Sequence, residues 1–372
     1  MKIPTSYLRM TAIAVLTAGL IGCGGGGGGG GPAIPTASNA AITPPPTTAV
    51  PITTGAQATN TTIAAAAFQA VNGAGLQTIG NIPSLAGAVT TAPTATETTR
   101  LMIAEIVRRH AEKIKDYMGS APVAGAQIVQ TVPCSVGGTE TFVVDDMSGN
   151  FSQIFVNCDE GGVIFHGTIS STGVSSNFML GSTPSSPYNI SIAATITIDL
   201  SITTVSPAAV LVSQGSFSFS VALSGTMVDN GAGGVMPDFP THTQTHITGP
   251  SLLASDGVNR EQLSNFALTV VDDDVTVATT INSGSHFTYA NSASAINGAV
   301  TVTIATAIHY AFEGAHPDAG VIEITTTSPG MIKVTFSSVA PLIMVQVYSD
   351  TAGTSLADTY NTLTWDQFEA LI

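Results

Sequence analysis

Two histidines and an aspartate in the middle of the chain have the residue types of a metal site. Asp238 precedes His242 and His246, and imidazole and carboxylate groups are common metal ligands. If residues 241–247 form a strand, the two imidazoles share one face but stand about 13 Å apart. One ion cannot bind both groups at that separation. Only a loop conformation would bring them together, so we predict no metal centre here.

Two groups of acidic residues could bind calcium weakly through carboxylate oxygens. Asp272, Asp273 and Asp274 are consecutive, and Asp350 and Asp358 flank a loop that contains glycine. Neither group follows the order of acids and glycine in an EF-hand loop. A charged hairpin tip explains both groups more simply, and we name no metal ligand in either.

The chain also lacks the sequence motifs of common catalytic sites. It contains no G-x-S-x-G nucleophile elbow, no P-loop, no dinucleotide-binding fingerprint and no H-E-x-x-H pair. We therefore name no catalytic residue and no cofactor, and we expect a protein that is not an enzyme.

The N-terminus is organised like a secretory signal. Lys2 and Arg9 precede an uncharged stretch, residues 10–21, which is too short to span a bilayer as a mature helix. Residues 20–23 read Leu-Ile-Gly-Cys, which resembles the lipobox of bacterial lipoprotein precursors. The resemblance implies that the chain is cleaved before Cys23, whose thiol carries the lipid. An ordinary signal peptide with a chance cysteine is the alternative.

A region of low complexity follows Cys23. Residues 24–31 are all glycine, and the next stretch is rich in proline, alanine and threonine without a periodic apolar face. Such a composition cannot bury a core, so we predict a signal peptide over residues 1–22 and a disordered tether over residues 23–59. Cysteine followed by polyglycine resembles the tether of surface-displayed lipoproteins of Gram-negative bacteria. Gly24, in place of aspartate, implies sorting to the outer membrane, on its periplasmic or cell-surface face.

Cys134 and Cys158 form an even pair in a chain that the signal directs to an oxidising compartment. They bracket two alternating apolar runs, residues 139–145 and 151–157, which we interpret as a β-hairpin. Symmetric pairing leaves the cysteines a few residues out of register, and residues 135–138 supply the slack. A redox or metal pair would favour Cys-x-x-Cys spacing. The sequence therefore predicts a disulfide between Cys134 and Cys158.

The charge of the chain argues against a nucleic-acid partner. The formal net charge is −15, and removal of Lys2 and Arg9 with the signal makes it more negative. Most other basic residues lie between Arg100 and Lys115. An acidic body repels phosphate backbones and anionic lipid headgroups. We expect membrane contact through the lipid anchor, together with a protein partner or an apolar ligand.

A helical segment, residues 60–122, is predicted between the tether and the sheet. Asn60 can cap a short helix that ends at Gly73. A Thr-x-x-Glu capping box then begins a second helix over residues 95–118. We expect its apolar face to dock on the body and its basic face to be solvated. The alternative is that the basic face contacts the acidic sheet or membrane headgroups.

After the helices, apolar residues recur at every second position, and the clearest run is residues 190–202. One-sided alternation indicates an antiparallel sheet with one buried face. Gly167, Gly225 and Gly298 lie in or beside such runs and indicate either bulges that curve the sheet or hairpin turns. We therefore predict a mainly β domain over residues 123–372, preceded by one or two helices. Its long-stranded antiparallel curved sheet would be a half-barrel, a barrel or a sandwich.

The anchor and the missing catalytic motifs favour a lipoprotein of the outer membrane or surface with a non-enzymatic binding or structural role in the envelope. The alternative is a carrier of lipid or another apolar ligand in a curved β-sheet covered by a helix, similar to bacterial lipoprotein-carrier half-barrels. An unrecognised hydrolase is a third hypothesis. An empty apolar cavity inside the sheet would favour the carrier, and a packed interior would favour the binding or structural role.

Overall fold

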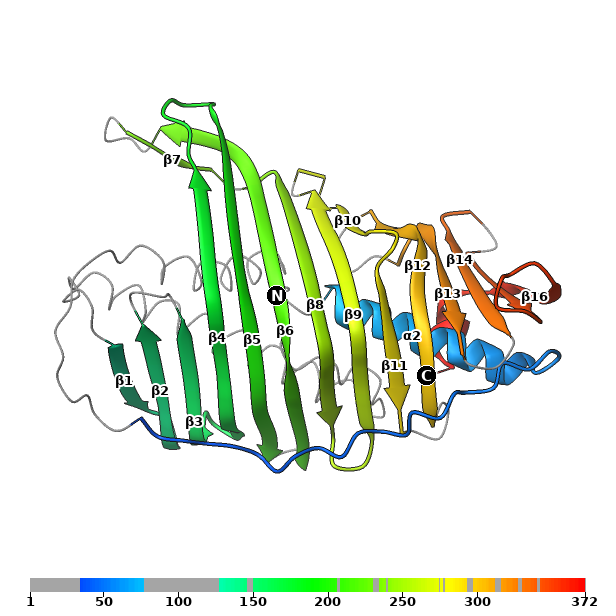
Figure 1. Ribbon diagram of the computed structural model, residues 1–372, viewed down its shortest axis with the longest axis horizontal. Helices are drawn as coiled ribbons and strands as arrows, with labels where there is room; N and C mark the ends of the chain where they lie inside the picture. The colour runs from blue at the N-terminus through cyan, green and yellow to red at the C-terminus, as the bar shows by residue number, and fades with distance from the viewer. Residues whose placement is uncertain are drawn as a thin grey trace.

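The computed structural model of the chain is dominated by one large antiparallel sheet (Figure 1). The predicted signal peptide, Cys23 and the helix predicted over residues 95–118 lie outside the part of the chain that it describes. The structure describes residues 34–76, 127–145, 150–205, 208–229, 234–238, 240–273, 275–276, 278–292, 297–311, 316–326, 330–339 and 342–371.

Sixteen strands form the sheet, and every pairing between them is antiparallel. They are β1 (Gln127–Pro133), β2 (Gly137–Asp145), β3 (Phe151–Asp159), β4 (Val163–Met179), β5 (Pro187–Val205), β6 (Ala208–Asp229), β7 (Val235–Pro237), β8 (His242–Ser255), β9 (Arg260–Asp273), β10 (Ala278–Ile281), β11 (His286–Asn291), β12 (Gly298–Tyr310), β13 (Ala319–Thr325), β14 (Met331–Ser337), β15 (Ile343–Tyr348) and β16 (Leu356–Leu363).

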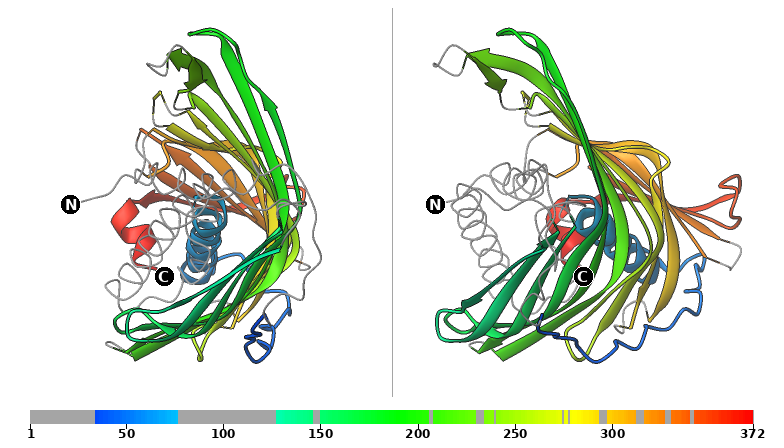
Figure 2. Two further views of the ribbon diagram at one scale, coloured as in Figure 1. Left: turned by 90° about the vertical axis from the view of Figure 1, so that its left-hand side faces the viewer. Right: turned by 60° about the vertical axis from the view of Figure 1, so that its left-hand side comes forward.

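The strands follow one another across the sheet almost in sequence order. Only β7, which pairs with β6, and β11, which pairs with β9 and β12, lie off the main path. Among the described strands, β1 and β16 are the two ends of the order, so the sheet is open. The predicted mainly β fold with a long-stranded, curved antiparallel sheet is confirmed (Figure 2).

The predicted alternation of buried and solvated residues is clearest in β5. Ile196, Ile198 and Leu200 are buried, whereas the intervening residues point to the opposite face. The buried residues of β5 belong to the same apolar cluster as the helix that lies inside the curve of the sheet. That face is called the concave face below, and the opposite face is called the convex face. One-sided alternation therefore follows from a sheet that is packed on one side only.

Two of the three glycines expected at bulges or turns permit close approach of other groups. A Cβ on Gly167 would lie 1.9 Å from the carbonyl oxygen of Asp199, and one on Gly225 would lie 2.8 Å from the ring of Tyr188. Each glycine sits in a continuous part of its ladder with β5 and permits close approach of another group there. Gly167 also lies next to a bulge, which is in the facing strand β3 between Phe155 and Cys158. The third, Gly298, begins β12.

Helix α2 (Gln57–Leu76) has an exposed first turn and is then buried on nearly all sides from Asn60 to Phe68. It begins three residues before the predicted cap, and Asn60 lies inside it with its side-chain Nδ2 donating to Thr53 O at 2.8 Å. The helix also continues past Gly73, so the predicted cap and end are both wrong. Helix propensity and tertiary burial of an alanine-rich segment override these local signals.

The concave face is filled by helices where β9 and β13–β15 lie. Helix α2 packs there together with α4 (Trp365–Glu369), a short helix with a capping box between Thr364 and Gln367. The ring of Phe68 on α2 lies 4.9 Å from that of Phe336 and 5.5 Å from that of Trp365, measured between centroids. Figure 2 shows the sheet curving around both helices. This part of the interior is packed with side chains.

No helix in the described ranges is long and apolar enough to cross a membrane.

Candidate functional site

An extended N-terminal segment crosses the outside of the sheet. Residues 34–53, called the strap below, run along one end of the strands from β3 toward β12 (Figure 1, dark blue). Ala37 is buried against Val143 and Ile154, which lie on the convex face. The predicted disordered tether over residues 23–59 is therefore wrong for residues 34–59, which are part of the folded body.

Asp199 on β5 holds the strap through one short network. The backbone N–H of Asn39 donates to Asp199 Oδ2 at 3.1 Å, and Asn39 Nδ2 donates to the Asp199 carbonyl oxygen at 3.2 Å. Gln214 on β6 completes the network, because its Nε2 donates to Asp199 Oδ1 at 2.9 Å and its Oε1 accepts from Ile42 N at 2.7 Å. Hydrogen bonds from single polar side chains fix the strap, which explains why it needs no periodic apolar face.

The far end of the strap joins β12 and then enters the core. Thr48 O accepts from Ala299 N at 2.9 Å, and Val50 N donates to Ala299 O at 3.2 Å, which forms a parallel bridge. Val50 and Ile52 are buried in the cluster that contains α2. The strap thus passes from the convex face into the concave core, and it connects two sides of the sheet before α2 begins.

Asp199→Ala should release the strap without unfolding the sheet. The variant removes the carboxylate that accepts from Asn39 N and Gln214 Nε2 but keeps the carbonyl that accepts from Asn39 Nδ2. We expect a loss of about 1–2 kcal/mol in the free energy of unfolding. Hydrogen exchange of peptides covering residues 34–53 should become faster. Thr197→Ala, an exposed convex position on the same strand, is the matched control and should change neither quantity. Unchanged exchange in the strap of Asp199→Ala would show that other contacts hold it.

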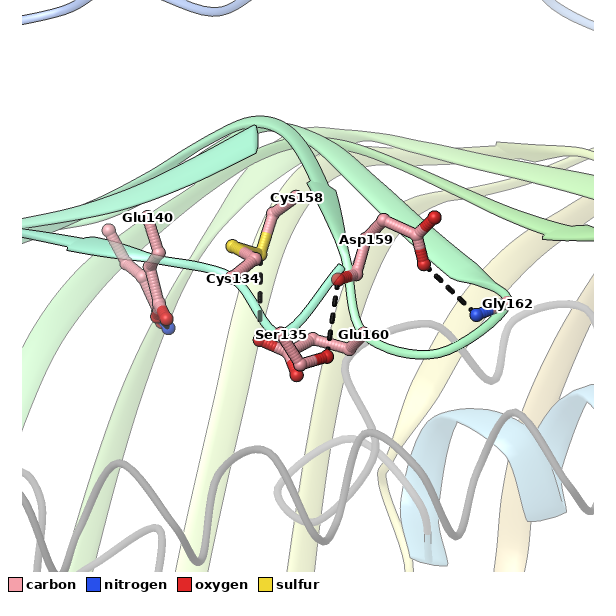
Figure 3. Close-up of a disulfide and its surroundings, with 8 residues drawn as sticks. Cys134, Ser135, Glu140, Cys158, Asp159, Glu160 and Gly162 are labelled. Atoms are coloured by element: carbon pink, nitrogen blue, oxygen red, sulfur yellow. Dashed lines mark hydrogen bonds between the residues drawn. A yellow bond between two sulfur atoms is a disulfide. The ribbon is translucent and has the colours of Figure 1, made fainter. Parts of the chain in front are cut away.

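The two cysteines of the body are bonded to each other, as predicted (Figure 3). Their Cα atoms lie 5.4 Å apart, and the bond links the end of β1 to β3. The expected slack lies in the turn between β1 and β2, where Val136 N donates to Asp159 O at 3.0 Å. Gly138 and Asn157 both have positive φ in this region, and they take up the offset in register. The disulfide therefore fastens the β1 end of the sheet.

Glu160 lies beside the disulfide, with its Oε1 3.9 Å from Cys158 Sγ. One ligand atom from each of Cys134, Cys158 and Glu160 would fit within 4.8 Å, which is a spacing that a metal ion could use. A disulfide has no thiolate to offer, however, and metals bind cysteine through the thiolate. The bonded pair is a structural element and does not form a metal site.

Cys134→Ser should lower the free energy of unfolding by about 3 kcal/mol at most. The bond closes a loop with a sequence separation of 24 residues, and a loop of this size gives about 3.5 kcal/mol in the chain-entropy model, of which engineered and native bonds often deliver less. Urea melts of the oxidised protein and of the variant measure the difference. Free-thiol labelling of both cysteines in the denatured, unreduced native protein would contradict the bond itself.

The histidines considered as metal ligands are not brought together with Asp238. His242 and His246 lie on β8 with exposed side chains, and His242 pairs across the sheet with Asp273 on β9. The Nδ1 atom of His246 lies 2.9 Å from Thr269 Oγ1. The strand conformation keeps the two imidazoles apart.

Two of the acidic residues considered as calcium ligands accept hydrogen bonds from the backbone of turns. Asp273 Oδ1 accepts from the backbone N–H groups of Thr276 and Val275, and these bonds lower the pKa of Asp273. Asp350 is held similarly by Thr354 and Ser355, which keep its pKa well below its usual range. These two residues match the predicted charged hairpin tips.

Asp272 differs from its neighbour Asp273, because it is buried on the concave face. Its Oδ1 accepts from Thr279 Oγ1 at 2.6 Å. Asp358, at the other candidate loop, accepts from Gly55 N at 2.6 Å through Oδ2 and so fastens the turn before α2. Asp274 lies outside the described residues.

Glu261 is a buried carboxyl group on the concave side of β9. It is 3% exposed and accepts hydrogen bonds from Tyr289 Oη at 3.0 Å and from Asn291 Nδ2 at 2.8 Å. Burial raises its pKa to about 8, the bond from Tyr289 opposes that shift, and the charge of Asp256 adds to it. Burial also raises the pKa of Tyr289. The Glu261 carboxyl is therefore protonated at neutral pH, and it links β9 to β11.

Among known proteins, no family model, no curated protein and no solved structure matches the chain. Sequence reasoning missed both the strap and the Glu261 cluster. For the strap, the available signal was the polar residue Asn39, whose type gives no indication of which strand it contacts. For Glu261, the signal was its position two residues before the apolar Leu263, which places both side chains on the buried face of β9. This alternation is interrupted at Asn265, which has positive φ.

Proposed function

We propose that the protein is an exported lipoprotein, anchored in the outer membrane through Cys23, that has a non-enzymatic binding or structural role in the envelope. The sequence support is the Leu-Ile-Gly-Cys motif after a short uncharged stretch. The structural support is the strap, which binds the chain to the convex face from Ala37 onward and so connects the N-terminal region to the folded body.

The strap would shorten the tether. Only residues 24–36 separate Cys23 from the first buried residue of the strap. A flexible chain of this length has a root-mean-square span of about 20 Å, compared with the roughly 30–35 Å of the longer tether that the sequence predicts. The sheet would therefore be held close to the bilayer, with the strap end of its strands attached to the anchor. Such a placement suits a structural element or a receptor that acts close to the membrane.

The packed interior favours this role over the carrier alternative. A carrier needs room for an apolar ligand inside the sheet. Over β9 and β13–β15, the space on the concave face is filled by Phe68 and neighbouring residues of α2, together with Trp365 and Phe368 of α4. An apolar ligand could enter this part of the sheet only if α2 moved away.

Cys23→Ala is the direct test of the anchor. The variant should lose acylation, and its body should leave the membrane fraction when the membranes are washed with a large volume of buffer. Gly24→Asp is the matched control, because it keeps Cys23 and should stay acylated. By the sorting pattern that the resemblance implies, the control should move to the inner membrane. Membrane retention of washed Cys23→Ala equal to that of the unmodified chain would contradict the proposal.

A further inference from the structure

The second half of β4 forms an edge of the sheet, although β4 lies inside the order of strands. β3 pairs with β4 only as far as Ser170, and β4 then continues to Met179, paired with β5 alone. Asn150 Oδ1 accepts from Val174 N at 3.4 Å on the β3 side, and residues 175–179, called the β4 edge below, extend beyond this contact. Figure 1 shows this part of β4 rising past the end of β3. Among the described strands, none pairs with that side of the β4 edge.

The side chains of the β4 edge are exposed on both faces of the sheet. Phe178 pairs with Ile190, which packs against the core, so Phe178 lies on the concave face. Asn177 and Met179 lie on the convex face, because successive residues of a strand alternate. Phe178 is 38% exposed and Met179 is 58% exposed. A strand added beside this edge would cover side chains on both faces, because its own side chains alternate in the same way.

The β4 edge lacks the charges, prolines and bulges that keep edge strands from pairing. It contains no charged residue and no proline, and its register with β5 is regular from Ser175 to Met179. Strand β16, at the end of the order of described strands, is different. Its pairing with β15 is interrupted at two points, and it carries Asp358. The β4 edge is therefore the better template for an added strand.

The charge of the chain is compatible with a second copy as the added strand. The net charge is −15, so two copies repel each other over most of their surfaces. Residues 167–198 contain no charged residue, so two copies can meet at the β4 edge without placing like charges along it. Strand addition uses backbone N–H and C=O groups, which are the same on both copies.

We propose that two copies of the protein pair antiparallel through their β4 edges, about a twofold axis beside Asn177. Pairing of the whole segment with itself places its middle residue, Asn177, opposite Asn177 of the second copy on the convex face. The two side-chain amides can exchange a hydrogen bond there. On the concave face, Phe178 lies diagonally across from Phe178 of the second copy, within reach of an aromatic ring. The inference concerns the folded body and does not rest on the proposed lipoprotein role.

Self-association through such a short segment is weak in solution. The contact is well below the roughly 800 Å² on each partner that a stable complex buries. The dimer should therefore form only at high protein concentration. Added salt should strengthen it, because salt screens the repulsion between two acidic bodies.

Cross-linking at the axis tests the contact. In the mature chain with Cys23→Ala, Asn177→Cys should form a disulfide-linked dimer on mild oxidation, because the two thiols face each other. Thr197→Cys is the matched control, at an exposed convex position of β5, which has a strand on each side. It should cross-link at least about tenfold more slowly, because the two thiols do not meet in the dimer. Equal rates for the two variants would overturn the proposal.

Charge substitutions give a second measurement that needs no covalent bond. Sedimentation should show concentration-dependent dimers of the Cys23→Ala parent. Asn177→Lys and Asn177→Asp should each dimerise at least about tenfold more weakly, because like charges meet at the axis. An equal mixture of these two variants should dimerise again. Val258→Lys, which adds a charge at an 83% exposed position elsewhere, should dimerise like the parent.

Two results of these measurements would contradict self-pairing. A parent that stays monomeric at high concentration, or a mixture of the lysine and aspartate variants that does not dimerise, would overturn the proposal. Slow hydrogen exchange of residues 175–179 in a monomeric parent would overturn it in favour of pairing with another segment of the same chain.

Discussion

Phe68→Ala is expected to lower the free energy of unfolding by about 3–5 kcal/mol, the range for removing a buried aromatic ring. Phe68 is 2% exposed, and its ring lies between the sheet and α4, 4.9 Å from Phe336 and 5.9 Å from Phe368 between centroids. Alanine would leave a cavity at the point where α2 meets both. Rigid neighbouring strands limit how far the site can collapse.

The fluorescence of Trp365, the single tryptophan, reports the change directly because its ring is 5.5 Å from that of Phe68. Urea melts followed at this residue give the free energy of unfolding. Gln69→Ala, at the next position of α2 and partly exposed, should change stability by less than about 0.5 kcal/mol. A loss below 1 kcal/mol for Phe68→Ala would mean that α2 does not fill the concave face.

Glu261 should make the protein less stable as the pH rises from about 4.5 to about 8. The folded pKa is about 8 and the unfolded value is near 4.3, so the folded state keeps a proton that the unfolded state has lost. The contribution is fully present below the unfolded pKa and disappears through the folded one. A shift of this size corresponds to a loss on the order of 5 kcal/mol across the window.

Glu261→Gln isolates this contribution, because the amide has nearly the same shape and its oxygen can still accept from Tyr289 and Asn291. We expect the variant to gain stability relative to the parent as the pH rises toward 9, in urea melts at pH 5, 7 and 9. Glu323→Gln makes the same chemical change on the opposite face of the sheet, at β13, and should give a curve parallel to that of the parent. Parallel curves for Glu261→Gln would contradict the burial of the carboxyl group.

The sheet was predictable because its signal is local. In β5 the isoleucines alternate with polar residues over almost the whole strand, and this pattern depends only on one face being buried. The disulfide could be predicted from the β2–β3 hairpin. Pairing of these strands places Cys134 and Cys158 near each other, and the turn before β2 accommodates their difference in register.

The strap could not be predicted because its contacts are not periodic and are distant in sequence. Asn39 and Asp199 are 160 residues apart, and neither has a neighbour whose type indicates the pairing. The start of α2 was misplaced for a related reason. Asn60 is a common cap, but its side chain is used to fasten the preceding turn at Thr53.

The lipoprotein proposal can be tested by measuring the mass of the N-terminal peptide of the mature protein, isolated from membranes. We expect this peptide to begin at Cys23 and to carry an acyl-modified thiol, with nothing retained from residues 1–22. A mature chain that begins at another residue, or a peptide that contains an unmodified Cys23, would contradict it.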